Sequence, residues 1–206
     1  MRKIGDIDLS DMDVWVGGYY EAAIVLGACT DPEADTRLHS AISEVWSSPN
    51  IKGCSFDRSG QGDAIPASEP LDRILRLYGW FQDREAGAIP FTTVVVRESE
   101  PDGQDWLYAA LPIGGLQMAI PSASFASFDP KGDNSWVKPI ERGLADIALA
   151  VSRKVPFLIA AIGEEIAGYI EEDAFNGVFS DCRRIGYVAP CDGAYRYLPN
   201  TVWNRD

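Results

Sequence analysis

The run from Val14 to Leu26 constrains the fold more than any other part of the sequence. It is the densest stretch of β-branched and aromatic residues near the amino terminus, and such residues fit a pleated, half-buried surface. Gly17 and Gly18 interrupt the run, and they can supply the positive φ that a two-residue hairpin or a β-bulge requires. Because the arm before the glycines is short, we expect either a hairpin or a bulged strand at this point.

Beyond the glycines, both faces of the expected strand are mainly apolar. One face carries Tyr20, Ala22, Ile24 and Leu26, and the other carries Tyr19, Glu21, Ala23 and Val25. This pattern predicts a strand that is covered on both sides. Glu21 is the single charge in that apolar setting, and a carboxylate there needs a hydrogen-bonding partner. It either reaches the rim or pairs with an arginine, or it is a site carboxylate with a raised pKa.

Three amphipathic helices are expected from capping residues and from apolar side chains at helical spacing. The first follows Thr30-Asp31-Pro32-Glu33 and covers Ala34 to Trp46. The second opens at Ser68-Glu69-Pro70 and ends near Gln82, and the third runs from Pro139 to Val151. The segment from Glu164 to Glu172 is a candidate for a shorter helix.

The expected strands lie between and after these helices. They cover Cys54 to Phe56, Phe91 to Val96, two strands within Asp105 to Ile120, Phe157 to Ile162, Arg184 to Val188, and Ala194 to Leu198. Together the elements predict an α+β fold with a mixed, largely antiparallel sheet and about three main helices. We expect a single domain over residues 1–206, with subregions 1–100 and 101–206. Whether the strands at Gly17-Gly18 and Gly114-Gly115 form a true repeat stays open.

The charge balance narrows the classes of partner. The chain has 206 residues, a formal net charge of −13 and a pI near 4.4. A field of that sign repels nucleic-acid phosphates and anionic membrane surfaces, so we expect neither as a partner. The basic start has no apolar h-region after it, and no apolar run is long enough to span a bilayer. These features indicate a cytoplasmic protein.

No motif of the common catalytic or cofactor-binding classes appears. The single histidine, His39, falls between the apolar and polar faces of the first helix, where a surface or boundary role is usual. There is no Gly-x-Ser-x-Gly elbow and no P-loop or dinucleotide-binding motif. An EF-hand beginning at Asp6 fails because Asp11 and Gly17 stand where glycine and glutamate are needed. We therefore expect no catalytic residue, no cofactor and no enzyme activity.

Cysteine spacing argues against a metal centre. Four tetrahedral thiolate ligands usually come as two close pairs, and no Cys-x-x-Cys occurs among Cys29, Cys54, Cys182 and Cys191. Buried free thiols are the expectation in a reducing compartment.

Acidic side chains supply the strongest candidate for a binding surface. The candidate partner-binding residues are Glu164, Glu165, Tyr169, Glu171, Glu172 and Asp173. A run of charges is usually a solvated face. Acids interleaved with aromatic residues can also capture a cationic partner quickly and hold it through aromatic anchors.

Part of the sequence resembles bacterial immunity proteins of polymorphic-toxin and type VI secretion systems. The resemblance rests on Trp15-Val16-Gly17-Gly18-Tyr19-Tyr20-Glu21, on the helix that ends Val45-Trp46-Ser47-Ser48-Pro49, and on Gly53-Cys54. It covers about the first quarter of the chain and is a likeness of pattern. It implies a protein that binds a cognate toxin, often a basic nuclease, and covers or distorts its active site. No inhibitory residue can be carried over.

Two other interpretations stay open from the sequence. A small-molecule binder or enzyme would use a buried carboxylate, Glu21, in a pocket lined by Trp15 and Tyr19, with convergent polar groups in a deep cavity. A structural subunit would instead expose a large apolar patch. The oligomeric state, a homodimer included, is not fixed by the sequence.

Overall fold

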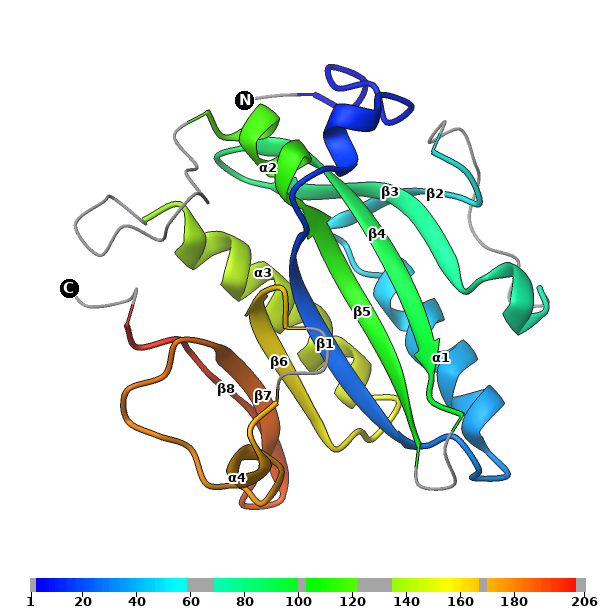
Figure 1. The fold of residues 1–206 in the computed structure, drawn as a ribbon, viewed down its shortest axis with the longest axis vertical. Coiled ribbons are helices and arrows are strands. Elements are labelled where there is room, and N and C mark those ends of the chain that lie inside the picture. Colours follow the sequence, from blue (N-terminus) through cyan, green and yellow to red (C-terminus); the bar gives the residue numbers. More distant parts are fainter. Residues whose placement is uncertain (1–2, 59–68, 100–102, 122–134, 167–169, 203–206) are drawn as a thin grey trace.

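The computed structural model describes residues 3–58, 69–99, 103–121, 135–166 and 170–202. Eight strands form one sheet in the order β2-β3-β4-β5-β1-β6-β7-β8, and every recorded pairing is antiparallel (Figure 1). The strands are β1 (Tyr19–Ala28), β2 (Ile51–Ser55), β3 (Arg76–Asp83), β4 (Gly87–Arg97), β5 (Gln104–Pro112), β6 (Ile159–Glu164), β7 (Gly186–Cys191) and β8 (Ala194–Leu198). The α+β prediction, with its largely antiparallel sheet, is confirmed.

The two long helices lie together against one face of this sheet. They are α1 (Ala34–Trp46) and α3 (Val137–Ser152), and both lie behind the strands in Figure 1. Their apolar stripes pack with Tyr20, Ile24 and Leu107 in the larger hydrophobic core. Both helices were expected from sequence, and α1 ends at the predicted residue. His39 is half-buried on α1, at the boundary position that the sequence indicated.

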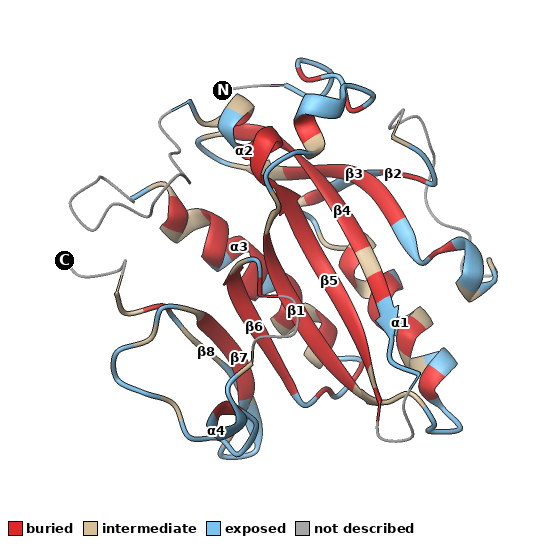
Figure 2. Cartoon of the chain, in the orientation of Figure 1, coloured by how far each residue is buried: buried red, intermediate tan, exposed pale blue. Residues whose placement is uncertain are grey.

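β1 is central, between β5 and β6, and it is buried on both faces as predicted (Figure 2). Its even-numbered side chains, such as Ala22 and Ile24, join the core under α1 and α3. Ala23 and Val25 join a smaller cluster on the opposite face, which we call the front face because it is turned toward the viewer in Figure 1.

The expected hairpin or bulged strand at Gly17-Gly18 is wrong. Residues Met12–Trp15 form a short 3-10 helix, η1, and β1 begins only after the glycines. Both glycines do have positive φ, 82° and 81°, so they turn the chain from η1 into the strand. A bulge is present, but it lies between Val25 and Gly27.

The predicted helix ending near Gln82 is also wrong. Leu71–Arg73 is a single 3-10 turn, η2, and the rest of the segment is β3. Leu77 and Phe81 join the larger core, while Tyr78 lies on the front face beside Thr92. Since both faces of β3 are buried, its apolar side chains do not alternate with polar ones, and the run fits helical spacing by coincidence.

The second strand expected within Asp105 to Ile120 is a helix, α2 (Ile113–Ala119). A Cβ on Gly114 would lie 2.1 Å from the carbonyl oxygen of Asp13, and one on Gly115 would lie 2.8 Å from the ring of Pro90. The Gly-Gly pair therefore lets α2 approach η1 and β4 closely. Because the two Gly-Gly pairs occupy different elements, the structure gives the repeat no support.

The chain after β6 differs from the expected helix over Glu164 to Glu172. Glu164 ends β6, and Glu165 turns away from it with φ 47°. A four-residue helix, α4 (Glu172–Phe175), follows and packs Ala174 into the front cluster. The two closing strands were expected, and β7 and β8 are joined by Asp192 and Gly193, whose positive φ values suit a two-residue hairpin turn.

Candidate functional site

The candidate carboxylates after β6 fall into two groups. Glu164 and Glu165 lie at one end of β6, and the backbone N–H of Glu165 donates to the carbonyl oxygen of Tyr19. α4 lies beside the turn of the β7–β8 hairpin, at the opposite end of these strands from Glu164 (Figure 1). The sequence treated these acids as one cluster. Tyr169, the expected anchor, lies outside the described residues.

Glu164 and Glu165 are close enough to affect each other's charge. Burial raises the pKa of Glu164, and the neighbouring charge of Glu165 raises it further. Glu164 pairs in register with Tyr20, and the Glu165 side chain packs over Gly18, where a Cβ would collide with its carboxylate. This pair thus belongs to the neighbourhood of Tyr19, which the sequence assigned to the small-molecule alternative.

The second group forms an exposed surface at α4, which we call the acidic corner. It comprises Glu171, Glu172, Asp173, Phe175 and Val178. Glu172 and Asp173 stand in the first turn of α4, where a negative charge is favourable near the free backbone N–H groups. Ala174 points inward, so these acids point outward and remain exposed (Figure 2).

The acidic corner combines unneutralised charge with exposed apolar side chains. None of its three carboxylates forms an ion pair with any residue that the structure describes. Phe175 is 43% exposed and Val178 is 62% exposed, among the largest exposed hydrophobic side chains of the described chain. Sequence reasoning missed both, although a phenylalanine two residues after an acidic run was a visible signal.

Glu21 is buried on the front face, with an exposed fraction of 5%. It lies in register between Ala110 of β5 and Gly163 of β6. Burial raises the pKa of Tyr108 to about 12, with smaller contributions from the charges of Glu21 and Glu98. Tyr108 stacks on Trp106, whose indole N–H donates to Glu98 at 3.0 Å.

Trp15 contacts Leu9 and Tyr78, on the β3 side of the sheet. Its indole N–H donates to the carbonyl oxygen of Leu9 at 2.8 Å, and its ring meets the edge of Tyr78 with centroids 5.1 Å apart. Tyr78 is on β3, which is separated from β1 by β4 and β5. The pocket of Trp15, Tyr19 and Glu21 therefore stays a prediction, with Trp15 placed toward the β3 side.

A buried polar cluster around Glu141 was not anticipated. Glu141 lies on α3 with no exposed surface, and its Oε1 accepts hydrogen bonds from the Tyr197 hydroxyl at 2.6 Å and the backbone N–H of Asn200 at 2.9 Å. The Tyr20 hydroxyl lies 3.5 Å from Oε2. The carboxylate thus ties α3 to β1 and to the chain that follows β8.

Burial sets the protonation behaviour of this cluster. It raises the pKa of Glu141, although the hydrogen bonds from Asn200 and Tyr197 act in the opposite direction. Burial and the Glu141 charge also raise the pKa values of Tyr20 and Tyr197. Neither phenol is activated as a nucleophile or base, so we assign the cluster a structural role.

The raised pKa gives a testable pH dependence. The folded state holds the Glu141 proton more tightly than the unfolded state, whose reference pKa is 4.5. The contribution of Glu141 to stability is therefore fully present below about pH 4.5 and is lost as pH rises through the raised folded pKa. We expect the unfolding free energy of the native protein, relative to Glu141→Gln, to fall between pH 4 and pH 7 in urea titrations at matched salt. A pH-independent difference would contradict this assignment.

No group of three or more His, Cys, Asp or Glu side chains in the described part of the chain could hold a metal ion. All four cysteines are free, but only Cys54 is buried, so the expectation of buried thiols holds at one position. No described helix is long and apolar enough to cross a membrane.

We compared the chain with protein-family models, with curated proteins and with solved structures, and none of the three comparisons found a match. The fold class rests on the sheet and helices described above, and function has to be argued from the sites themselves.

Proposed function

We propose that the protein is a toxin-neutralising immunity protein that binds a basic cognate toxin, a nuclease effector being one candidate, through the acidic corner. The observation that carries this proposal is that three carboxylates without an ion pair to a described residue share one surface with exposed Phe175 and Val178. A basic partner would satisfy both features, because its Lys and Arg side chains complement the acids while an apolar side chain covers the phenyl ring.

The net charge of the chain also favours a basic partner. A formal net charge of −13 attracts a basic protein before the two surfaces touch, and this attraction raises the association rate at low salt. Binding should therefore weaken as salt rises, since the Debye length shortens from about 10 Å at 0.1 M to about 3 Å at 1 M. The resemblance of the first quarter of the chain to immunity proteins agrees with this proposal.

The test begins with the partner that the purified protein captures from source-cell lysate, identified and then purified. We expect that changing Glu164, Glu165, Glu171, Glu172 and Asp173 to their amides weakens binding of this partner roughly tenfold to hundredfold, since each exposed pair contributes up to about 1 kcal/mol. Titration calorimetry at fixed salt measures the loss. Changing only the three acids of the acidic corner should account for most of it.

A matched control separates local recognition from net charge. The control variant changes five exposed acids elsewhere to amides: Asp6, Asp13, Glu33, Asp72 and Glu85. Both variants lose five negative charges, so an equal loss of affinity would mean that only long-range charge matters. Unchanged affinity in the first variant would contradict the assignment of the binding surface.

A further inference from the structure

The chain that follows β8 turns back and contacts the segment that leads from the acidic corner to β7. We call residues 199–202 the clasp and residues 180–184 the return segment. The hydroxyl of Thr201 in the clasp accepts from the backbone N–H of Arg183 at 2.7 Å and donates to the carbonyl oxygen of Asp181 at 2.8 Å. The backbone N–H of Thr201 donates to the carbonyl oxygen of Arg183 at 2.9 Å. Three hydrogen bonds from one clasp residue therefore hold the return segment.

The clasp is fixed in turn to α3 through Asn200, which is 1% exposed. The backbone N–H of Asn200 donates to Oε1 of Glu141 at 2.9 Å, and its side-chain amide donates to the carbonyl oxygen of Arg184. The guanidinium of Arg183 adds a hydrogen bond to the carbonyl oxygen of Pro199 at 3.2 Å. A continuous set of contacts therefore runs from the buried Glu141 through the clasp to the return segment.

The acidic corner has few restraints of its own. α4 is a single helical turn of four residues, and helices of that length are stable only when tertiary contacts hold them. On one side, Ala174 packs into the front cluster. On the other side, Val178 is followed by Phe179, whose ring packs against Tyr187 with centroids 5.1 Å apart, and then by the return segment. The arrangement of the corner therefore depends on how firmly the return segment is held.

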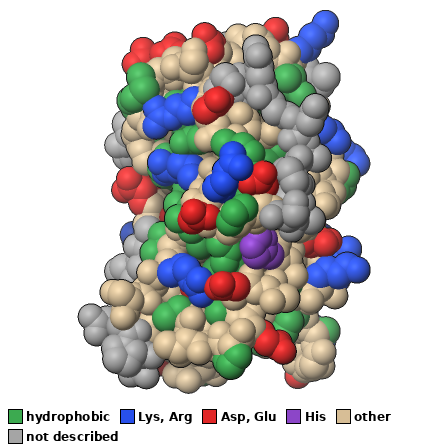
Figure 3. Space-filling model, turned by 90° about the vertical axis from the view of Figure 1, so that its right-hand side faces the viewer, with side chains coloured by type: hydrophobic (Ala, Val, Ile, Leu, Met, Phe, Trp, Pro, Cys, Tyr) green, Lys and Arg blue, Asp and Glu red, His purple; other side chains and the backbone are tan. Residues whose placement is uncertain are grey.

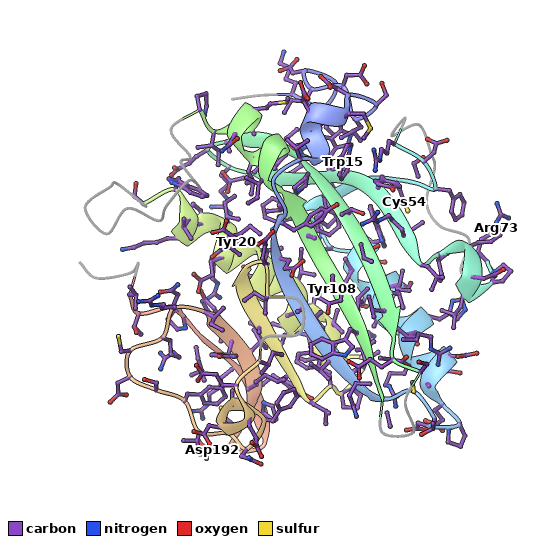
Figure 4. The ribbon with its side chains drawn as sticks, in the orientation of Figure 1. Trp15, Tyr20, Cys54, Arg73, Tyr108 and Asp192 are labelled. Atoms are coloured by element: carbon purple, nitrogen blue, oxygen red, sulfur yellow. The ribbon has the colours of Figure 1, made fainter. Side chains whose placement is uncertain are left out.

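The clasp and the acidic corner lie at opposite ends of the β7–β8 hairpin. In Figure 1 the chain between α4 and β7 passes from the turn of the hairpin to its open end. In Figure 4, Asp192 marks the turn, and Tyr20, whose hydroxyl lies 3.5 Å from the carboxylate of Glu141, lies toward the open end. Since β8 has five residues, the two ends are separated by about 17 Å. The clasp is thus placed to act on the corner through the return segment.

The charge on the other side of the molecule is mixed. Figure 3 shows the side turned away from α4, where Lys, Arg, Asp and Glu side chains are interspersed. Opposite charges that lie close together largely cancel in the field that reaches a partner. The three carboxylates of the acidic corner form no ion pair with a described residue, so their attraction for a basic partner depends on how they are arranged.

From these contacts we infer that the clasp sets the arrangement of the acidic corner before a basic partner binds, with Thr201 and Asn200 as positioning residues. The identity of the partner in this inference rests on the proposed function. With the clasp closed, the carboxylates are ordered in the free chain, so binding does not have to order them. With the clasp open, the partner has to order the corner itself and binds more weakly. Affinity is thus controlled from the far end of the hairpin without a change in charge.

The first test is made on the free chain. Thr201→Val removes the hydroxyl and both of its hydrogen bonds at nearly constant volume, and Thr201→Ser keeps the hydroxyl. Hydrogen exchange should become roughly tenfold faster in Thr201→Val at the amides of Ala174, Gly177 and Val178, which donate within the corner. Thr201→Ser should restore nearly native rates at these amides. The amide of Val14 in η1 should keep its native rate in both variants.

A clasp that only adds to overall stability would give a different pattern. Exchange of the core amides of β1 would become faster while the corner amides kept their native rates, and this result would overturn the inference. Thr36→Val is the matched control, because it makes the same change at an exposed position on α1. It should alter neither exchange at the corner nor binding of the partner. Circular dichroism checks that all three variants are folded.

The second test uses the purified basic partner. Thr201→Val keeps every acidic residue, yet it should bind the partner roughly three- to tenfold more weakly in titration calorimetry at fixed salt, and Thr201→Ser should bind like the native protein. Native affinity in Thr201→Val, with its corner amides exchanging faster, would overturn the inference and leave the proposed function intact. If the native protein binds no basic partner while the corner amides still respond to Thr201→Val, the proposed function fails and the link between clasp and corner stands.

Discussion

Replacing Glu141 with alanine is expected to lower the free energy of unfolding by about 3 kcal/mol, one of the largest effects of any single substitution in this chain. The change removes the acceptor for the Tyr197 hydroxyl and for the backbone N–H of Asn200. Asn200 is almost fully buried, so its N–H would have no water to bond instead. Urea unfolding followed by circular dichroism measures the loss.

Asp146→Ala is the control for this prediction, because Asp146 lies on the same helix and is exposed. It forms an ion pair with Arg142 at the surface, and we expect a change of about 0.5 kcal/mol or less. Glu141→Gln should fall between the two, since its amide oxygen can still accept from Tyr197 and Asn200. If Glu141→Ala were no more costly than Asp146→Ala, the buried cluster would not hold α3 to the end of the chain.

The second large effect is expected from Gly114→Ala, with a loss of about 2 kcal/mol. The new methyl group would lie 2.1 Å from the carbonyl oxygen of Asp13 and 3.0 Å from that of Val14, and backbone atoms cannot rotate away as a side chain can. We expect η1 to separate from α2. The hydrogen bonds from Ile113 N–H to Gly18 and from Gly114 N–H to Val16 would then open.

Hydrogen exchange of the Ile113 and Gly114 amides measures this separation directly, alongside urea unfolding. Gln117→Ala is the matched control, because Gln117 is exposed on the same helix and its substitution should change stability by about 0.5 kcal/mol or less. Native protection at both amides in Gly114→Ala would contradict the close packing of α2 on η1.

The sequence predicted the helices and strands that are determined by residues close together in the chain. α1 follows a proline and acidic residues, and its apolar side chains recur at helical spacing, so its bounds could be predicted directly. β1 and β4 are dense in β-forming residues and were both predicted as strands, and β1 is buried on both faces as expected. β3 was missed because a strand buried on both faces has no polar alternation, and its residues matched a helical stripe equally well.

Features set by distant contacts could not be predicted. The Gly-Gly pair in α2 is explained by Asp13 and Pro90, which are remote in sequence. Glu141 shares the apolar stripe of Val137, Leu144 and Ala145, which was a visible warning. Its closest hydrogen-bond partners, Tyr197 and Asn200, lie more than fifty residues further along the chain. The sequence identified the acids from Glu164 to Asp173 as a candidate surface. It did not predict that they fall into two groups, because that division depends on β6 ending at Glu164.

The measurement that tests the central claim most directly is titration calorimetry of the purified captured partner against the native protein, the five-acid variant and its charge-matched control, together with an assay of the partner's toxic activity. The account predicts a basic partner that the native protein binds and inhibits at a one-to-one ratio of chains. Binding should be weakened by the changes at Glu164, Glu165 and the acidic corner, and much less by the control changes. A captured partner that binds both variants equally, or that stays fully active when bound, would contradict the proposal.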